Sequence, residues 1–188
     1  MRSTSEFNNL YNKCLSNSRS HQKKLYIKYY PSVYTICLRY APNKHDCLDY
    51  TQDVFIKVFD VMSAFKGESY AEFGAWIKRV TTNYCIDQYR KNKKHNNLVS
   101  IHNIPESIAD PDKSEYTELD YDVDQIINAM HKLSPSYRTI FNMYVMEGHR
   151  HKEIAEILGI SVGTSKSNYH KAKKNIKNIL EKDNAKLV

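Results

Sequence analysis

Residues 152–168 constrain the fold of this chain most strongly, because two helical patterns follow one another around a glycine. The first pattern places apolar side chains on one helical face, at Ile154, Ala155, Ile157 and Leu158. Gly159 then stands where a helix ends, since a residue without Cβ adopts the left-handed conformation at no steric cost. Ser161 offers a side-chain oxygen to the first backbone N–H groups of a second helix. The stretch therefore predicts two short helices joined by a tight turn.

The second predicted helix has one apolar side and a polar, basic remainder. Its apolar side carries Val162, Tyr169, Ala172 and Ile176. Its other positions carry Lys166, Ser167, Asn168, His170, Lys171 and Lys173. A second helix with such a surface suits the major groove of DNA, so we interpret the stretch as a helix-turn-helix.

The rest of the chain is expected to be helical as well. Its 188 residues are enough for one large domain or two small ones, and a hydrophobic fraction of 41% is adequate for packed cores. Five glycines and five prolines are too few for a turn-rich β protein. No apolar run reaches membrane-spanning length, and the first residues lack the apolar core of a secretory signal. We expect an all-α, cytoplasmic protein with no membrane insertion.

Charge divides the chain into three parts. Residues 1–104 carry 16 basic against 8 acidic residues, and residues 125–188 carry 11 against 5. The intervening residues 105–124 carry 1 basic against 8 acidic residues. We therefore predict two basic helical domains, at 1–94 and 122–188, joined by a flexible acidic linker at 95–121. Basic domains imply a polyanionic partner, and the acidic linker is hypothesised to lie in a basic channel that a nucleic acid would otherwise use.

Neither catalysis nor a cofactor is predicted. The four cysteines form no CxxC pair, so reduced, partly buried thiols are expected rather than a metal site. The sequence shows no paired carboxylates at metal spacing, no glycine-rich phosphate loop and no Ser/His/Asp arrangement. A DNA-processing enzyme is therefore the weakest alternative.

The N-terminal domain shows several helical patterns. A helix capped near Ser5 is followed by a second, whose apolar positions are Leu25, Tyr29, Val33, Ile36, Cys37 and Tyr40. Pro31 predicts a break or kink in the second helix near Tyr30. Ser69 and Glu72 fit a capping box at the start of a later helix.

Aromatic and basic residues are interleaved along that later helix. Tyr70, Trp76, Tyr84 and Tyr89 alternate with cations, a pattern typical of surfaces that stack single-stranded bases. The alternative is that the rings belong to the core, and for Trp76 and Tyr84 we favour the core.

Two separate motif sets resemble the extracytoplasmic-function (ECF) sigma factors of the sigma-70 family. Residues 133–141, 147–148, 153–155, 158–161, 163–164 and 166–167 resemble region 4 of that family. Residues 49–55 look like region 2.2, and residues 65–69, 76–77, 83 and 87–91 look like regions 2.3 and 2.4. The sets occur in the family's order and cover roughly residues 20–182.

The resemblance implies a role for each set. Asp49, Gln52, Asp53 and Lys57 would dock on the clamp helices of the β′ subunit of core RNA polymerase, although spacing alone suggests solvated surface. The melted −10 element would be bound by Phe65, Lys66, Gly67, Glu68, Ser69, Trp76, Lys78, Arg79, Asn83, Arg90 and Lys91. The −35 element would be bound by Thr164, Lys166, Ser167, Asn168, His170, Lys171 and Lys173. Further expected partners are the β flap, promoter DNA and an anti-sigma factor.

Two positions of the predicted recognition helix depart from the family pattern. Ser165 stands where many members carry valine, which predicts weaker helix packing. Asn168 stands where many carry arginine, which removes a phosphate contact and offers a side chain that pairs with adenine. An ordinary helix-turn-helix regulator remains the main alternative function, but it leaves residues 49–55 and 65–83 without a role.

Overall fold

The computed structural model describes residues 2–97 and 122–184. These residues form helices joined by short turns, and the described part contains no strand, so the predicted all-α class is confirmed. The predicted linker falls mostly outside the described residues, and with it the hypothesis that the linker fills a basic channel. The chain divides into two compact units, residues 1–88 and 89–188.

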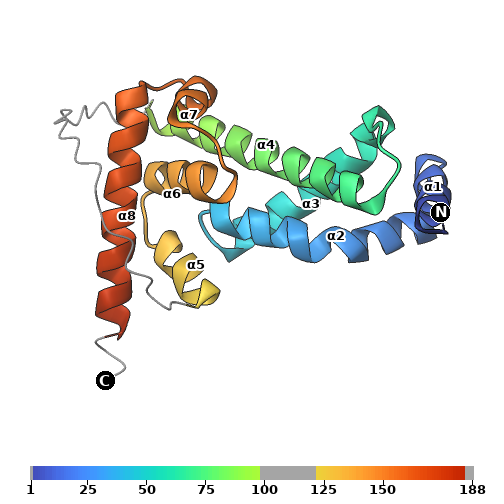
Figure 1. Cartoon of the computed structure of the whole chain (residues 1–188), viewed down its shortest axis with the longest axis horizontal. Coiled ribbons are helices and arrows are strands. Elements are labelled where there is room, and N and C mark those ends of the chain that lie inside the picture. Colours follow the sequence, from blue (N-terminus) through green and yellow to red (C-terminus); the bar gives the residue numbers. More distant parts are fainter. Residues whose placement is uncertain (1, 98–121, 185–188) are drawn as a thin grey trace. The chain divides into compact units, whose positions relative to one another are not determined.

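The first unit is built from four helices and one 3₁₀ turn (Figure 1). These are α1 (Arg2–Leu15), α2 (Arg19–Tyr40), α3 (Lys44–Val61), η1 (Met62–Ala64) and α4 (Tyr70–Asn97), which continues past the unit boundary. Helix α2 packs along α3 and also contacts α1. None of the described helices is long and apolar enough to span a membrane.

The core of the first unit is formed by apolar stripes that meet between its helices. All six apolar positions predicted for α2 are buried. Val54, Phe55 and Val58 of α3 and Phe73 and Ile77 of α4 are buried as well. Each such side chain contributes about 1.5–3 kcal/mol when removed from water, so the stripes hold these helices together.

Two predictions about the first helices are wrong. Helix α1 begins at Arg2 rather than after a cap near Ser5. Helix α2 runs without a break through Pro31. Pro31 is exposed, so solvent can satisfy the carbonyl group that lacks its N–H partner. Buried Tyr29 and Val33 on either side hold the helix in place.

The four cysteines all lie in the core of the first unit as free thiols. Burial raises the pKa of Cys14 and of Cys47 to about 11. Because the thiolate is the reactive form, these two cysteines behave as small apolar side chains.

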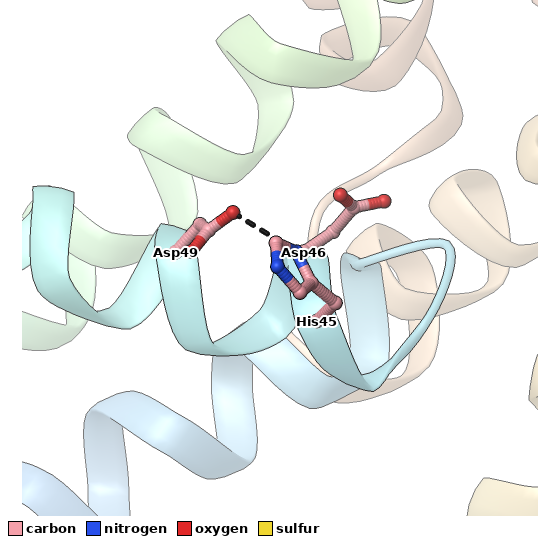
Figure 2. A group of neighbouring side chains, drawn as sticks. All are labelled: His45, Asp46 and Asp49. Carbon is pink, nitrogen blue, oxygen red and sulfur yellow. Dashed lines mark ion pairs between the residues drawn. The ribbon is translucent and has the colours of Figure 1, made fainter.

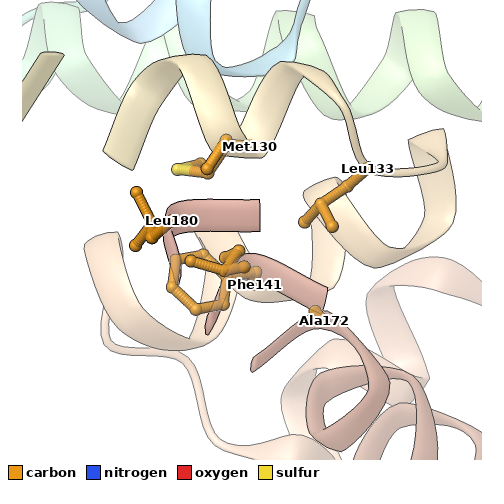
Figure 3. Packing of buried hydrophobic residues seen from close by; sticks show 7 residues of the cluster. Met130, Leu133, Phe141, Ala172 and Leu180 are labelled. Carbon is orange, nitrogen blue, oxygen red and sulfur yellow. The ribbon is translucent and has the colours of Figure 1, made fainter. Parts of the chain in front are cut away.

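The second unit packs short helices against one long helix (Figure 1). Its elements are α5 (Val123–His131), α6 (Pro135–Phe141), the π-helical turn η2 (Asn142–Met146), α7 (His151–Leu158) and α8 (Val162–Asn184). Helix α8 contacts α5, α6 and α7. Figure 3 shows the core between them, which consists of Ala129, Met130, Leu133, Phe141, Ala172, Ile176 and Leu180.

Helix ends in the second unit follow the predicted signals. Ser134 accepts a hydrogen bond from the Tyr137 N–H, and Pro135 occupies the first turn of α6. Gly159 ends α7 with φ of 61° in the left-handed region. The Ser161 hydroxyl accepts from the Thr164 N–H at 2.9 Å and so caps α8. The predicted helix-turn-helix is therefore present at α7 and α8.

Candidate nucleic-acid and protein interfaces

One face of α3 carries exposed polar side chains at helical spacing. Asp49, Gln52, Asp53 and Lys57 are all exposed, and positions three, four and eight residues after Asp49 share its face. The structure thus brings together the four residues predicted to dock on polymerase.

An exposed isoleucine that the sequence reasoning missed lies among them. Ile56 follows Gln52 by four residues and Asp53 by three, and 61% of its surface is exposed. An apolar side chain surrounded by charges is typical of the centre of a protein interface. The signal available in the sequence was its spacing, which places it outside the buried stripe of α3.

Asp53 is held by a residue from another helix. The Tyr84 hydroxyl of α4 donates to Asp53 Oδ2 at 2.5 Å. Burial, followed by this hydrogen bond and the carboxylate charge, raises the pKa of Tyr84, so the hydroxyl stays protonated. Tyr84 is half-buried and also meets Tyr50 edge to face. The predicted core role of Tyr84 therefore includes orienting a surface carboxylate.

A small polar cluster of His45, Asp46 and Asp49 lies at the N-terminal end of α3 (Figure 2). His45 Nδ1 lies 3.2 Å from Asp49 Oδ2, and the Asn43 amide donates to Asp46 Oδ2 at 2.9 Å. Within the described ranges, these three titratable residues are the only such group whose ligand atoms all lie within 4.8 Å of one another. The positive end of the helix dipole disfavours a cation here, and we interpret the cluster as a helix cap with an ion pair.

The loop between η1 and α4 presents two charged side chains on a constrained backbone. Lys66 and Glu68 are exposed, whereas Phe65, Gly67 and Ser69 are partly buried. Ser69 Oγ accepts from the Glu72 N–H at 3.3 Å, which is the forward bond of the predicted capping box. Glu72 Oε2 reaches back and accepts from the Ser69 hydroxyl at 2.7 Å and from the Glu68 N–H at 3.0 Å. These hydrogen bonds, that of Ser69 first, lower the pKa of Glu72.

The side chain of Phe65 packs beneath the loop against aromatic residues of α4. Its ring meets Phe73 at 5.0 Å and Trp76 at 5.7 Å between centroids. A Cβ atom at Gly67 would lie 2.4 Å from Phe65 Cζ, so the glycine allows the loop to close over the ring. Phe65 and Gly67 shape the loop, while the exposed Lys66 and Glu68 are available to a ligand.

Helix α4 continues from the loop with a polar face. Arg79, Asn83 and Arg90 are exposed and follow Trp76 at helical spacing, with Lys91 at the edge of the same face. Lys78 is exposed on a different side of the helix. Trp76 is half-buried and stacks on Phe73 at 5.3 Å, which fits the predicted core role and leaves part of the ring accessible.

The exposed face of α8 is basic. Lys166, Ser167, His170 and Lys171 lie opposite the buried Ser165, Ala172 and Ile176. Lys174, which the sequence reasoning missed, extends this face because it follows Lys171 by three residues.

The remaining predicted −35 residues lie at the sides of that face. Thr164 is bound to the cap, with 2.8 Å between its hydroxyl and that of Ser161. Asn168 is partly buried, and Lys173 lies over the Tyr169 ring at 5.6 Å. Val162, predicted on the apolar side of the helix, is 42% exposed, and Ser165 takes the buried place instead.

A part-buried polar contact links the two helices of the helix-turn-helix. The Ser165 hydroxyl lies 3.0 Å from His151 Nδ1, which joins α8 to the start of α7. The His151 ring stacks on Tyr144 at 4.4 Å and 15°. Burial, then the neighbouring Lys166 and His170, lower the pKa of His151, which favours the neutral ring at pH 7.

Comparison with known families matches both units. The sigma-70 region 2 model matches residues 25–95, and the "Sigma-70, region 4" model matches residues 124–176, together more than half of the chain.

Individual relatives agree with the family models. The ECF RNA polymerase sigma factor SigE of Mycolicibacterium smegmatis is 28% identical over 156 residues, covering 80% of this chain and 58% of that relative. SigW of Bacillus subtilis, with the same description, is also 28% identical over 156 residues, covering 77% of this chain and 81% of the relative. Among solved structures, the sigma factor RpoE in complex with the anti-sigma factor NepR from Bartonella quintana has a TM-score of 0.47 at 21% identity, covering 85% of this chain and 96% of that chain.

The two family matches occur in the order of the two motif sets: the region 2 match covers most of the first unit and ends within α4, and the region 4 match lies in the second unit. The chain belongs to the sigma-70 family, and the relatives that it matches are ECF RNA polymerase sigma factors.

Proposed function

We propose that this protein binds core RNA polymerase and directs it to a specific set of promoters, where it recognises and helps to melt the DNA. The observation that carries the proposal is the exposed α3 face, in the same chain as a helix-turn-helix. A regulator that only binds duplex DNA needs the helix-turn-helix alone. Because α3 carries a charged surface centred on exposed Ile56, the polymerase subunit is favoured over the ordinary regulator.

The α3 face is proposed to dock on the clamp helices of the β′ subunit. Asp49 and Asp53 provide negative charge, and Tyr84 fixes the carboxylate of Asp53 before the partner arrives. A side chain held in its bound geometry loses less conformational entropy on association. The second unit is proposed to contact the β flap in the same complex.

The loop at residues 65–69 and the polar face of α4 are proposed to hold the melted −10 strand. Lys66 and Arg79 are exposed cations for phosphates, and the accessible part of Trp76 is suited to stacking. Asn83 is exposed on the same face and can hydrogen-bond to a base. A flipped base costs a few kcal/mol to extrude, so a constrained loop and stacking must repay that cost.

Helix α8 is proposed to enter the major groove at the −35 element. Lys166, Ser167, His170 and Lys171 face outwards, and Lys174 extends the contact along the phosphate backbone. The loop and α8 would then bind two elements of one promoter.

The chemistry of transcription stays with the polymerase in this proposal, and the protein acts in the cytoplasm where the polymerase is. An anti-sigma factor that covers both units is the proposed inhibitory partner.

The deciding experiment is association with core RNA polymerase. Labelled protein is mixed with core enzyme, and binding is measured for the wild type, for Asp53→Ala and for Glu6→Ala. Glu6→Ala is the charge-matched control, because Glu6 is exposed on α1, outside the α3 face. Binding by the wild type and the control, with a loss of about tenfold or more for Asp53→Ala, is expected for a buried charged contact. No association of the wild type would refute the proposal.

A further inference from the structure

Helix α1 lies outside the matched region 2, which begins at residue 25, yet one of its side chains reaches the base of the loop. Phe7 is 1% exposed, and its ring lies 6.1 Å from Phe65 and 5.1 Å from Tyr70, both edge to face. Phe65 precedes the exposed part of the loop and Tyr70 follows it. The Phe7 ring therefore contacts both ends of the loop.

A second side chain of α1 fixes the backbone at the same place. The Tyr11 hydroxyl donates to the Met62 carbonyl at 2.5 Å, and the Phe65 carbonyl lies at 3.4 Å. The Met62 carbonyl also accepts from the Phe65 N–H at 3.0 Å, so the hydroxyl adds a second donor, from another helix, to the turn that leads into the loop. Burial raises the pKa of Tyr11, so the donor keeps its proton.

The loop has little freedom once its base is fixed. Tyr11 and Phe73 enclose the Phe65 ring, with centroids at 5.8 Å and 5.0 Å. Gly67 closes over that ring, and Glu72 holds the end of the loop. A shift of the Phe65 backbone would move Gly67, and with it Lys66 and Glu68.

We propose that Phe7 and Tyr11 are positioning residues for the loop at residues 65–69, so that α1 sets how tightly the melted −10 strand is held. This inference rests on the proposed role of the loop. Neither residue needs to contact DNA: each acts through the backbone and ring of Phe65. Helix α1 is thereby a determinant of promoter melting rather than only a part of the core.

The test uses the full-length protein assembled with core polymerase. The probe is a fluorescent single-stranded oligonucleotide that carries the non-template −10 region of a promoter identified by transcript-start mapping. Tyr11→Phe removes the hydroxyl and keeps the ring, while Tyr26→Phe makes the same change in α2, where Tyr26 packs on Phe55. Affinities for core polymerase and for duplex −35 DNA are measured in parallel.

Tyr11→Phe is expected to weaken oligonucleotide binding by about three- to tenfold, the range for one lost hydrogen bond. Tyr26→Phe should bind like the wild type, and no variant should change binding to core polymerase or to −35 duplex. Wild-type affinity in Tyr11→Phe, or an equal loss in all three assays, would overturn the inference. A wild-type holoenzyme that fails to bind the oligonucleotide would instead refute the proposed role of the loop itself.

A double-mutant cycle gives a second measurement. Gly67→Ala places a Cβ atom against the Phe65 ring and should disturb the loop independently of α1. If Tyr11 acts through the loop, Tyr11→Phe should reduce the affinity for the oligonucleotide less in the Gly67→Ala background than in the wild type. The two losses of binding free energy are then not additive. Additive losses would show that Tyr11 acts elsewhere and would contradict the inference.

Discussion

Ser165 and His151 form the polar contact that joins the two helices of the helix-turn-helix, with 3.0 Å between the hydroxyl and Nδ1. Ser165 is fully buried, at a position where the resemblance to region 4 led us to expect valine. The serine was expected to weaken the packing of α8. The structure instead gives its hydroxyl a partner from α7, so an apolar contact is replaced by a hydrogen bond.

Substitution at this contact should loosen the second unit. Ser165→Ala leaves His151 Nδ1 without its partner and should lower the free energy of unfolding of this unit by about 1 kcal/mol. Ser165→Val also adds volume at a fully buried position and should cost about 2 kcal/mol or more. Hydrogen exchange of α7 and α8 amides in the full chain measures this effect. The single tryptophan, Trp76, lies in the first unit, so its fluorescence is the control and should not change.

The second unit should also lose stability in acid. Burial and the neighbouring Lys166 and His170 lower the pKa of His151 below its usual 6.5, and burial together with Arg138 lowers that of His131. The unfolded chain therefore binds more protons than the folded one below pH 6.5. The stability that the two neutral histidines contribute is fully present above pH 6.5. It is lost as the pH falls from 6.5 through their folded-state pKa values, so the free energy of unfolding decreases.

Histidine NMR titration and urea unfolding between pH 7.5 and 5.5 measure this dependence. His151→Gln should flatten it. A titration midpoint of His151 at or above 6.5 would contradict the prediction.

Local signals predicted the elements of the second unit well, because each acts within a few residues. Gly159 and Ser161 end and begin their helices through their own backbone and side-chain chemistry. Burial along α8 was predicted less well. Hydrophobic periodicity selected Val162 and passed over Ser165, since it cannot detect a hydrogen-bond partner 14 residues away.

Longer-range contacts explain the other differences. Pro31 should end a helix by its own preferences, but buried side chains on both sides keep α2 continuous. The contact of Tyr11 with the loop spans 51 residues, and that of Tyr84 with Asp53 spans 31. Hydrophobic periodicity along the sequence cannot predict contacts between residues so far apart. The predicted site residues could therefore be grouped by family resemblance, while the residues that position them needed the structure.

The exposed isoleucine of α3 provides a sharp test of the docking face. Ile56→Ser should weaken binding to core RNA polymerase by about tenfold, as loss of a central apolar contact costs at least 1–2 kcal/mol. Ile27→Ser is the matched control, because Ile27 on α2 is also 61% exposed. Both variants should unfold like the wild type. Equal polymerase affinities of the two variants would place the docking surface elsewhere.

Salt dependence separates phosphate contacts from base contacts on α8. Lys171→Ala should weaken binding of the full chain to all duplex sequences and reduce the slope of log affinity against log salt by about 0.9, the value for one phosphate. Lys174→Ala should do the same, since Lys174 extends the exposed face beyond Lys171. Lys132→Ala is the control, because Lys132 lies on the end of α5 and pairs with Asp183 at 2.7 Å. A changed sequence preference in Lys171→Ala, with an unchanged slope, would instead assign that lysine to base recognition, because a base contact releases no counterion.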